Sequence, residues 1–298
     1  MISIMYNKRG TVSITLERGL AVNWHIVSDS SCDMLEGYLA PDIYLSIVPQ
    51  KVIIDQCEYT DDANIDIPGM MAAMEAARKT GSSCPTPQEF AEKFAQGDHV
   101  ICVCLSSALS ATFQAACMAR DEIHQTDPDR PIFVLDSKRT SGAMELIIMR
   151  LKEMMEQGLS FAEMTDSITD FASKTQVLFT LECFENLIKG GRMSRSSALL
   201  ASILSIRPIA MGTPEGTISV IDKPRGLPMT VRRMVEHMQR LKDLRLCCVI
   251  ISHCNNLDVA QRIQTLLQQV AAPKEVLIRQ LRGICSYYAD QHGVAVSF

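Results

Sequence analysis

The 298-residue sequence is poor in aromatic residues and has no surplus of basic ones. It contains 9 Phe, 6 Tyr and 1 Trp, and its 29 Lys and Arg are outnumbered by 34 Asp and Glu, which gives a net charge of -5 at pH 7. A protein that binds nucleic acid neutralises phosphates with a basic surface and often stacks bases on aromatic rings. The composition therefore argues against nucleic acid as a partner.

The sequence also lacks a long apolar run. No stretch reaches the roughly 18 to 20 apolar residues that a membrane-spanning helix needs. The apolar stretch at the start of the sequence ends at the polar group Asn7-Lys8-Arg9-Gly10 and is too short for the apolar core of a signal peptide. We therefore expect a cytoplasmic protein without a membrane span, whose contact with a membrane surface is at most transient.

Familiar catalytic and cofactor motifs are missing as well. There is no Gly-x-Ser-x-Gly elbow, no Gly-x-Gly-x-x-Gly turn and no Gly-Lys-Ser/Thr phosphate loop. The 11 cysteines are an odd number, and Cys102 and Cys104 lie inside an apolar run without the spacing of a zinc site. We expect buried, reduced thiols, no metal and no cofactor. The scattered histidines neither support nor exclude a Ser-His-Asp arrangement.

From Trp24 onward, short apolar runs alternate with helical segments, which is typical of an α/β protein. We predict an extension at 1–23 with a strand pair around 7–10, a Rossmann-like domain with a parallel sheet at 24–172, and a second α/β domain at 173–298. Predicted strands of the first domain cover 24–27, 44–48, 51–55, 99–105 and 131–135, and predicted helices cover 68–79, 109–124 and 142–157. In the second domain, short strands flank the turn Gly212-Thr-Pro-Glu-Gly216, which favours a mixed, largely antiparallel sheet.

Serines cluster directly after several of these strands. The clusters are Ser28, Ser30 and Ser31; Ser106, Ser107 and Ser110; Ser137; and Ser82 with Ser83, which we place in a loop over 80–87. Ligands of open α/β sheets bind at the carboxyl ends of strands, where helix N-termini offer free N–H groups. The pattern predicts an anion site for a carboxylate or a phosphate. The alternative is that these serines only cap helices.

A second candidate anion site follows position 188. Lys189-Gly-Gly-Arg192-Met-Ser-Arg195-Ser-Ser joins two predicted helices. Two glycines let the backbone approach a ligand closely, and an arginine guanidinium is suited to a carboxylate or a phosphate. The alternative is a glycine C-cap followed by a serine N-cap.

Four motifs occur in order along the chain. Ser28-Asp-Ser-Ser-Cys-Asp33 is similar to Thr-Asp-Ser-Ser-Cys-Asp, and Ser82-Ser-Cys-Pro-Thr-Pro-Gln-Glu-Phe90 to Thr-Ser-Gln-Pro-Ser-Pro-Glu-Glu-Phe. Leu105-Ser-Ser-Ala-Leu-Ser-Ala-Thr-Phe-Gln114 is similar to Leu-Ser-Ser-Gly-Leu-Ser-Gly-Thr-Tyr-Gln, and Leu187-Ile-Lys-Gly-Gly-Arg-Met-Ser194 to Leu-Lys-Lys-Gly-Gly-Arg-Ile-Ser. The second sequence of each pair is typical of the DegV family of bacterial fatty-acid-binding proteins. Residues 25–298 therefore resemble this family.

The resemblance implies two α/β domains with a fatty acid between them, its tail buried and its carboxylate held by hydroxyl groups. It implies that Ser82 and Ser110 bind the carboxylate directly and that Ser83 and Ser107 support them, and we include Ser28 and Ser30 in the same site. Arg192 matches a family arginine implicated in phosphotransfer and partner contact. The implied partner is a fatty-acid kinase.

The C-terminal loop departs from the family pattern. Family members usually have Gly-Pro-Val-Ile-Gly-x-His-Thr-Gly-Pro-Gly before the last strand, with the histidine near the lipid head group. This chain has Arg282-Gly-Ile-Cys-Ser-Tyr-Tyr-Ala-Asp-Gln-His-Gly293, and a gap-free alignment places Tyr288 at the histidine position. A tyrosine donates a hydrogen bond to a carboxylate but does not supply the charge of an imidazolium. We expect lipid binding to be kept and phosphotransfer to be the step that needs a test.

We predict a non-catalytic carrier that binds a long-chain fatty acid in an apolar tunnel and presents its carboxylate to a partner such as a fatty-acid kinase. Two alternatives remain. One is a hydrolase or transferase that acts on a small phosphorylated or acyl substrate in the same crevice. The other is a lipid sensor that works without a kinase.

Overall fold

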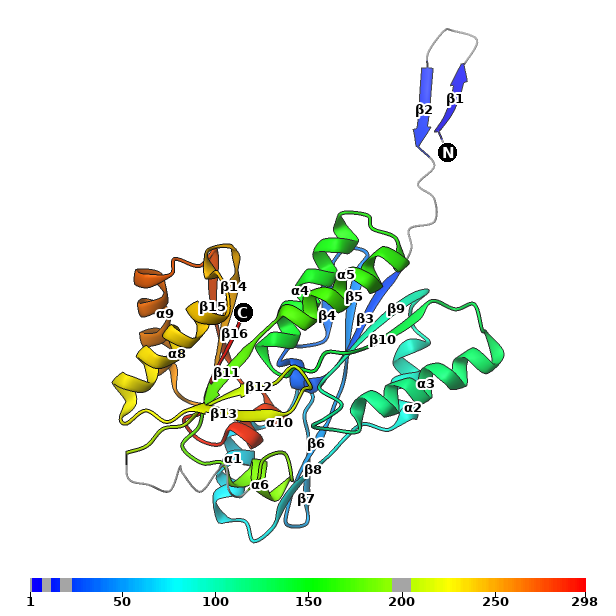
Figure 1. The fold of residues 1–298 in the computed structure, drawn as a ribbon. Coiled ribbons are helices and arrows are strands. Elements are labelled where there is room, and N and C mark those ends of the chain that lie inside the picture. Colours follow the sequence, from blue (N-terminus) through cyan, green and yellow to red (C-terminus); the bar gives the residue numbers. More distant parts are fainter. Residues whose placement is uncertain (1, 7–11, 17–22, 195–204) are drawn as a thin grey trace.

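The computed structural model describes residues 2–6, 12–16, 23–194 and 205–298. Within these ranges the strands form four sheets, arranged as in Figure 1. The first is an antiparallel pair, β1 (Ile2–Tyr6) with β2 (Val12–Leu16), which confirms the strand pair predicted near the N-terminus. The turn between them lies outside the described residues. No helix of the described chain is both long enough and apolar enough to span a membrane.

The first large sheet has the order β10–β9–β3–β5–β4, and its strands run parallel except for β4 at one edge. The strands are β3 (Trp24–Asp29), β4 (Gly37–Ala40), β5 (Ile43–Val48), β9 (His99–Cys104) and β10 (Ile132–Asp136). The run from Val100 to Cys104 is buried throughout because helices cover both faces of the sheet. This confirms the parallel sheet predicted for the first half of the chain.

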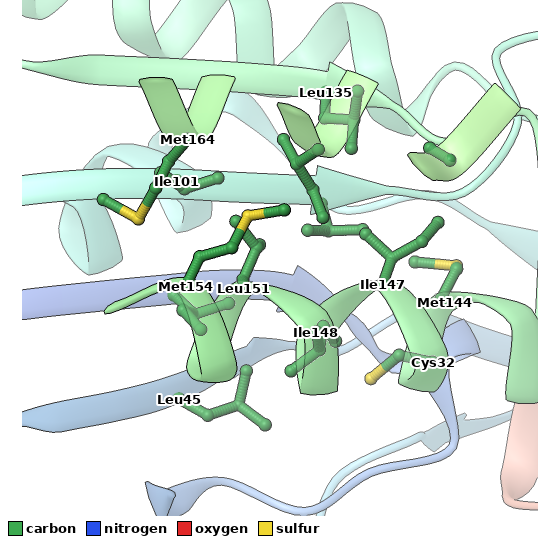
Figure 2. Close-up of a cluster of buried hydrophobic side chains, with 14 of the residues drawn as sticks. Cys32, Leu45, Ile101, Leu135, Met144, Ile147, Ile148, Leu151, Met154 and Met164 are labelled. Carbon is green, nitrogen blue, oxygen red and sulfur yellow. The ribbon is translucent and has the colours of Figure 1, made fainter. Parts of the chain in front are cut away.

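Helices cover this sheet on both sides. α2 (Pro87–Phe94) and α3 (Thr112–Thr126) pack on one face, and α4 (Gly142–Glu156) and α5 (Phe161–Lys174) pack on the other. The hydroxyls of Thr86 and Ser160 begin α2 and α5 with capping boxes. Figure 2 shows side chains of α4 such as Ile147 and Leu151 in one apolar core with Ile101 of β9. Burial of these faces, more than helix propensity, stabilises the layer.

A small antiparallel sheet of order β7–β6–β8 packs against the C-terminal part of the chain. Its strands are β6 (Lys51–Ile54), β7 (Cys57–Thr60) and β8 (Thr80–Ser83), and α1 (Ile67–Ala76) and α10 (Gly283–Ala289) share an apolar core with it. The loop predicted over 80–87 is therefore wrong for its first four residues. Thr80-Gly-Ser-Ser has no apolar alternation, and it is a strand because its backbone pairs with β6, whose Val52 and Ile54 are buried.

The C-terminal half contains a mixed sheet of order β13–β12–β11–β16–β14–β15. Its strands are β11 (Val177–Thr180), β12 (Ile209–Gly212), β13 (Ile218–Asp222), β14 (Cys248–His253), β15 (Glu275–Gln280) and β16 (Val294–Ser297). Neighbours are antiparallel except for β14 with β15, which confirms the predicted mixed, largely antiparallel sheet. The predicted turn connects β12 and β13, and the Thr213 amide donates to the Thr217 carbonyl across it.

Helices α8 (Leu227–Leu241) and α9 (Leu257–Val270) bury their apolar faces against one side of this sheet. Among the described residues, this half also contains two short helical segments, α6 (Glu185–Lys189) after β11 and the 3-10 turn η2 (Leu244–Leu246) before β14. The second of the two helices predicted around Arg192 was expected to follow Ser197, and residues 195–204 lie outside the described residues. The other face of the sheet, opposite α8 and α9, is turned toward the first half of the chain, and α4 lies between the two large sheets (Figure 1).

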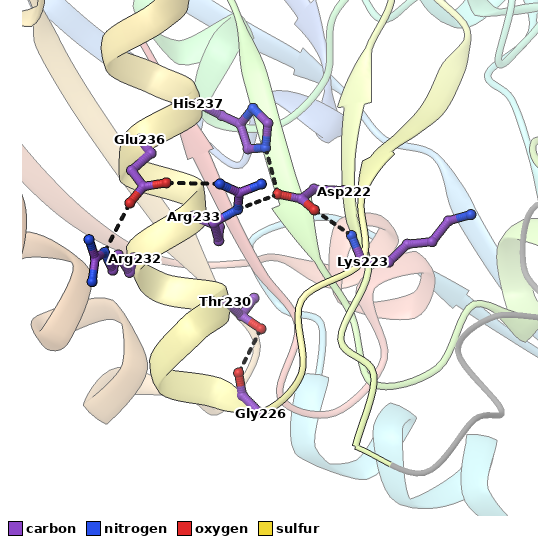
Figure 3. Close-up of polar contacts among 8 residues, drawn as sticks. All are labelled: Asp222, Lys223, Gly226, Thr230, Arg232, Arg233, Glu236 and His237. Carbon is purple, nitrogen blue, oxygen red and sulfur yellow. Dashed lines mark hydrogen bonds and ion pairs between the residues drawn. The ribbon is translucent and has the colours of Figure 1, made fainter.

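An ionic network ties the edge strand β13 to α8 (Figure 3). Asp222 accepts hydrogen bonds from Arg233 Nε at 2.8 Å and from His237 Nε2 at 2.9 Å, and Arg233 also contacts Glu236 at 3.1 Å. Partly exposed ion pairs of this kind contribute on the order of 0–1 kcal/mol each. The network therefore orients the edge strand and adds little to the stability of the fold.

The two halves are fastened together by loops that follow β9 and β10. Arg139 is buried, and its Nε donates to the Thr175 carbonyl at 2.6 Å while its Nη1 donates to the Thr213 carbonyl at 3.1 Å. Ser106 Oγ donates to the Gly216 carbonyl at 2.7 Å. These bonds hold the tip of the β12–β13 hairpin against the first half, because a buried guanidinium needs every acceptor that it can reach.

Candidate ligand-binding site

A cavity lies between the two halves, at the carboxyl ends of the strands of the first large sheet. Its empty space, counted out to open solvent, is about 830 Å³. The first half lines it with Ser31, Gln50, Ser82, Leu105, Leu109, Ser110, Thr140 and Ser141. The second half lines it with Val177, Phe179, Leu181, Leu187, Arg192, Ile218, Leu281, Ile284, Cys285, Tyr288, Ala289, Val294 and Ala295.

The two walls differ in polarity. Apart from Leu105 and Leu109, the first half contributes polar side chains, which we call the polar wall. Apart from Arg192, Tyr288 and the thiol of Cys285, the second half contributes hydrocarbon, which we call the apolar wall. Arg192 is the one side chain with a full charge among the lining residues that the structure describes. The cavity is therefore amphipathic and suits a molecule with one negative group and a long apolar part.

The apolar wall follows the two-residue period of a strand. Val177, Phe179 and Leu181 alternate along β11 and its end, so their side chains point to the same face of the sheet. Ala295 of β16 pairs with Phe179 in the sheet and lines the cavity beside it. The small alanine next to the large ring leaves the space that the cavity occupies.

Four of the eight predicted site residues meet at the cavity: Ser82, Ser110, Arg192 and Tyr288, which we call the Ser82 cluster. Ser82 Oγ and Tyr288 Oη lie 2.7 Å apart. The Arg192 guanidinium carbon lies 5.6 Å from the centre of the Tyr288 ring, and Arg192 Nε donates to the carbonyl of Leu109, the neighbour of Ser110, at 2.8 Å. The cluster brings three hydroxyls and one cation together, which is a suitable set for a carboxylate.

Ser110 also stands at the beginning of a helix. Its Oγ lies 2.8 Å from Thr112 Oγ1, and the N-cap of α3, Ala111, makes no side-chain hydrogen bond to the helix amides. A helix N-terminus carries a partial positive charge. The start of α3 therefore adds to the attraction of the Ser82 cluster for a negative group.

The structure places Ser28 and Ser30 outside the cavity lining. Ser28 Oγ donates to the Val103 carbonyl at 2.9 Å, inside the first large sheet. Ser30 lies in the 3-10 turn η1 (Ser30–Cys32), and its Oγ accepts the Gln50 amide at 3.1 Å. Both hydroxyls are buried and bind the protein's own backbone.

Ser83 and Ser107 also lie outside the lining. Ser107 Oγ donates to Asp136 at 2.6 Å, and the Ser107 amide donates to the same carboxylate at 3.1 Å. Ser83 follows Ser82 along β8 and therefore points to the opposite face of that strand. Ser107 is thus bound to Asp136, which is neither the predicted ligand contact nor the helix-cap alternative, since the N-cap of α3 is Ala111.

Three buried aspartates that the sequence analysis did not single out hold the polar wall in place. Asp29 accepts the Leu105 amide at 2.8 Å and Gln50 Nε2 at 3.0 Å. It also accepts hydrogen bonds from the amide and the hydroxyl of Ser31. Burial raises the pKa of Asp29, and these donors oppose the rise. One carboxylate thus orients three lining residues.

Asp33 connects the polar wall to the start of α10. It accepts the Ser141 hydroxyl at 2.7 Å and the Arg282 amide at 2.8 Å. Burial raises the pKa of Asp33 to about 7. A sequence signal was present, because Asp29 and Asp33 belong to the same motif as Ser28. The motif's carboxylates, and not its first hydroxyls, support the cavity.

Asp61 makes the third such link. It is buried in the segment after β7, and its two carboxylate oxygens accept the amides of Gly283 and Ile284 at 2.9 Å each. Burial raises the pKa of Asp61, and these hydrogen bonds oppose the rise. No motif marks this residue in the sequence, since its partners lie more than 200 positions away.

Three further residues of the polar wall were not predicted from the sequence: Gln50, Thr140 and Ser141. Each follows a strand of the first large sheet, β5 or β10, so the rule that selected serines after strands applies to them equally. The residues of the apolar wall carried no comparable signal. An apolar strand residue has the same sequence pattern whether it faces a filled core or a cavity.

Cys285 lies in the apolar wall, and its sulfur is 3.9 Å from Thr140 Oγ1. Burial raises the pKa of the Cys285 thiol well above its ordinary value, with the nearby carboxylates acting in the same direction. The thiol is therefore neutral at physiological pH, and only a thiolate is a good nucleophile. Cys285 contributes a small apolar surface to the site.

Known proteins resemble this chain along nearly its whole length. A family model described as "Uncharacterised protein, DegV family" matches residues 23–298. A DegV domain-containing protein of Streptococcus gordonii is 30% identical over 279 residues, which cover 93% of this chain and 99% of the relative.

Two solved structures share the fold closely. A DegV family protein from Eubacterium eligens, loaded with heptadecanoic acid, has a TM-score of 0.87 and 28% identity, covering 92% of this chain and 98% of its own. The Streptococcus pneumoniae Fatty Acid Kinase (Fak) B3 protein, loaded with linoleic acid, has a TM-score of 0.89 and 27% identity, covering 93% of this chain and 99% of its own. Because the family model spans all but the first 22 residues, the chain belongs to the DegV family.

Proposed function

We propose that this protein binds a long-chain fatty acid in the cavity between residues 24–172 and 173–298 and presents its carboxylate to a kinase partner. The acyl chain lies against the apolar wall, and the carboxylate lies at the Ser82 cluster. The observation that carries this proposal is the combination, in one cavity, of an extended hydrocarbon surface with Arg192, the one fully charged side chain among the described lining residues. A monoanion with a long hydrocarbon chain matches both features.

The two parts of such a ligand contribute differently to binding. Burial of roughly a dozen methylenes at about 0.8 kcal/mol each gives on the order of 10 kcal/mol before the cost of association. A hydrogen bond to a carboxylate contributes about 1.5–3 kcal/mol. The apolar wall therefore supplies most of the affinity, and the Ser82 cluster fixes which end of the ligand faces the partner.

The relatives support this assignment. The proteins from Eubacterium eligens and Streptococcus pneumoniae hold heptadecanoic acid and linoleic acid, and each shares its fold with more than nine-tenths of this chain. The second is named as a B3 protein of a fatty acid kinase, which supports a kinase as the partner of this chain as well.

We further propose that the protein is a carrier and not an enzyme. The cavity lining within the described residues includes no histidine, aspartate, glutamate or lysine that could act as a base toward a bound substrate. The thiol of Cys285 is protonated, and burial is the main cause. A hydrolase or transferase in the same cavity is therefore the less favoured assignment.

Mass spectrometry of solvent extracts from the purified native protein tests the carrier directly. We expect one equivalent of a fatty acid with a long acyl chain per protein. An empty protein, or one loaded with a small phosphorylated metabolite, would contradict the proposal and favour the enzyme. Turnover of generic esters that is lost in Ser110→Ala would favour the enzyme as well.

A second experiment separates a kinase-linked carrier from a sensor that works without a kinase. The loaded protein is mixed with ATP and the catalytic subunit of a bacterial fatty-acid kinase, and acyl phosphate is measured. We expect acyl phosphate in the native protein and its loss in Arg192→Met, because Arg192 is the charge nearest to the proposed carboxylate position. A protein that holds its fatty acid but is never phosphorylated would favour the sensor.

A further inference from the structure

Helix α10 carries side chains into the cavity but has little stability of its own. It has seven residues, begins with Gly283, and makes no side-chain cap with its own N-cap residue, Arg282. Isolated helices of this length do not form in water. Even so, α10 places Ile284, Cys285 and Tyr288 at the cavity, and Tyr288 belongs to the Ser82 cluster. The position of the Tyr288 hydroxyl therefore depends on what holds α10.

The start of α10 is held by two carboxylates from the first half of the chain. Asp61 accepts the first two helical amides, those of Gly283 and Ile284, at 2.9 Å each. Asp33 accepts the amide of Arg282 at 2.8 Å. These are the free N–H groups that every helix start exposes, and here they are satisfied by side chains from more than 200 residues earlier. Both carboxylates are also favourably placed at the positive end of the helix dipole.

The fit around Asp61 is close. A Cβ on Gly283 would lie 2.6 Å from Asp61 Oδ1, so only glycine lets the carboxylate reach both amides. Asp61 is 1% exposed, so its carboxylate depends on hydrogen-bond partners within the protein. The carboxylate thus fixes the helix start in distance and direction.

Other contacts hold the middle of α10 less directly. Asn186 Nδ2 donates to the Tyr287 carbonyl at 2.8 Å, and Tyr287 Oη donates to Thr80 Oγ1 at 3.2 Å. These bonds keep α10 near β8, but they come from its later turn and satisfy none of the amides at the helix start. Loss of Asp61 should therefore displace α10 without detaching it.

We propose that Asp61, assisted by Asp33, is a positioning residue that sets the place of α10 and, through it, of the Tyr288 hydroxyl in the Ser82 cluster. Its effect on ligand affinity rests on the proposed function, whereas its effect on Tyr288 does not. Asp61 does not line the cavity. Its influence on a bound carboxylate therefore passes through the groups that it binds, and the Tyr288→Phe background isolates the part that passes through Tyr288.

The first test uses ¹⁹F NMR to measure the environment of Tyr288 in the protein without ligand. The six tyrosines are replaced by 3-fluorotyrosine, and the ¹⁹F resonance of Tyr288 is assigned by its loss in Tyr288→Phe. We expect Asp61→Asn to shift or broaden this resonance, because an asparagine can accept only one of the two amides. The exposed neighbour provides the control, and Asp62→Asn should leave the resonance in place.

The second test measures coupling through a fluorescent long-chain fatty acid. We expect Asp61→Asn to weaken binding about fivefold in the native background and less than twofold in Tyr288→Phe, because the two substitutions remove the same interaction. Equal losses in both backgrounds, or an unchanged Tyr288 resonance, overturn the positioning role. If Asp61→Asn does not fold, Asp33→Asn gives the same two measurements at the other anchor. A native protein that binds no fatty acid overturns the proposed function and leaves the resonance test standing.

Discussion

The two walls of the cavity come from different halves of the chain and from different kinds of structure. The polar wall is built from loops at the carboxyl ends of parallel strands, at residues such as Ser31, Gln50 and Ser141. The apolar wall is built largely from one face of an antiparallel sheet, where Val177 and Phe179 alternate with residues of the opposite core. The cavity exists only because these two surfaces meet.

The difference between the two walls shows that a polar residue in the sequence is not necessarily a ligand-binding residue. Ser31 and Gln50 donate to Asp29, and Ser141 donates to Asp33, so much of the hydrogen-bonding capacity of the polar wall is used within the protein. In the Ser82 cluster, the hydroxyls of Ser82 and Tyr288 bond only to each other among the described residues, an arrangement that a bound carboxylate could extend. Which serine binds a ligand depends on its neighbours in space.

The largest effect should come from weakening the junction between the two halves of the chain, which carry the two walls. Arg139→Met removes the donors to the Thr175 and Thr213 carbonyls at the buried junction. We expect the free energy of unfolding to fall by about 3–5 kcal/mol, since buried acceptors lose a charged donor. Urea unfolding measures the change. Arg150→Met, which removes a surface ion pair with Glu153, is the control and should cost less than about 1 kcal/mol. A similar small loss for Arg139→Met would mean that the halves hold together without it.

Filling the apolar wall should have the next largest effect. Ala295→Phe places a ring beside Phe179, in the space proposed for the acyl chain. We expect long-chain fatty-acid affinity to fall by at least about 100-fold, because the tail supplies most of the binding energy. Titration with a fluorescent fatty acid measures it. Ala162→Phe on the exposed side of α5 adds the same ring outside the cavity and should change nothing. A native-like affinity of Ala295→Phe would mean that the acyl chain does not lie beside Phe179.

Changes in the Ser82 cluster should have a smaller effect. We expect Ser82→Ala and Ser110→Ala each to weaken fatty-acid binding by about tenfold, as the loss of one hydrogen bond to a carboxylate implies. Ser107→Ala is the matched control, because Ser107 donates to Asp136 and does not line the cavity. Calorimetric titration with a soluble fatty acid distinguishes the three. Unchanged affinity in both Ser82→Ala and Ser110→Ala would falsify the carboxylate position.

The smallest effect concerns the carboxylates behind the polar wall. Because burial raises the pKa of Asp33 to about 7, the folded protein binds a proton at this group more readily than the unfolded chain does. The free energy of unfolding should therefore rise as the pH falls from 8 to 6, by about 1 kcal/mol from Asp33. Asp29 and Asp61 act with the same sign, since burial raises both pKa values. Asp33→Asn should flatten this rise in urea unfolding, and Asp62→Asn should not. A stability that falls over the same range would contradict the assignment.

The larger elements of the fold could be predicted from the sequence because their signals are local. Apolar runs such as Val100–Cys104 mark buried strands. The capping boxes at Thr86 and Ser160 are local signals as well, but the predicted helices did not include α2 or α5. The strand at Thr80–Ser83 had no such signal. Its four residues are polar or glycine, and they form a strand only because β6 lies beside them. Long-range pairing thus decided what local propensity did not.

The candidate site was predictable in part. Serines after strands, the four motifs and the alignment of the C-terminal loop led to Ser82, Ser110, Arg192 and Tyr288, which the structure brings together. The same rule also selected Ser28, Ser30, Ser83 and Ser107, which lie outside the lining, and it passed over the buried aspartates. The sequence does not show which hydrogen-bond partner a hydroxyl or a carboxylate will have in the folded protein. Asp61, for example, meets the amides of Gly283 and Ile284 across 222 and 223 positions.

By itself, the sequence determined an α/β chain with a parallel sheet followed by a mixed one, without a membrane-spanning run, and with the motifs of the DegV family. These properties follow from local composition and from periods of two or 3.6 residues. Only the tertiary structure decided which hydroxyls face the cavity, which carboxylates support it, and that an apolar sheet face forms its second wall. Those outcomes depend on contacts between distant residues, where packing and desolvation, and not local pattern, determine which groups remain available for a ligand.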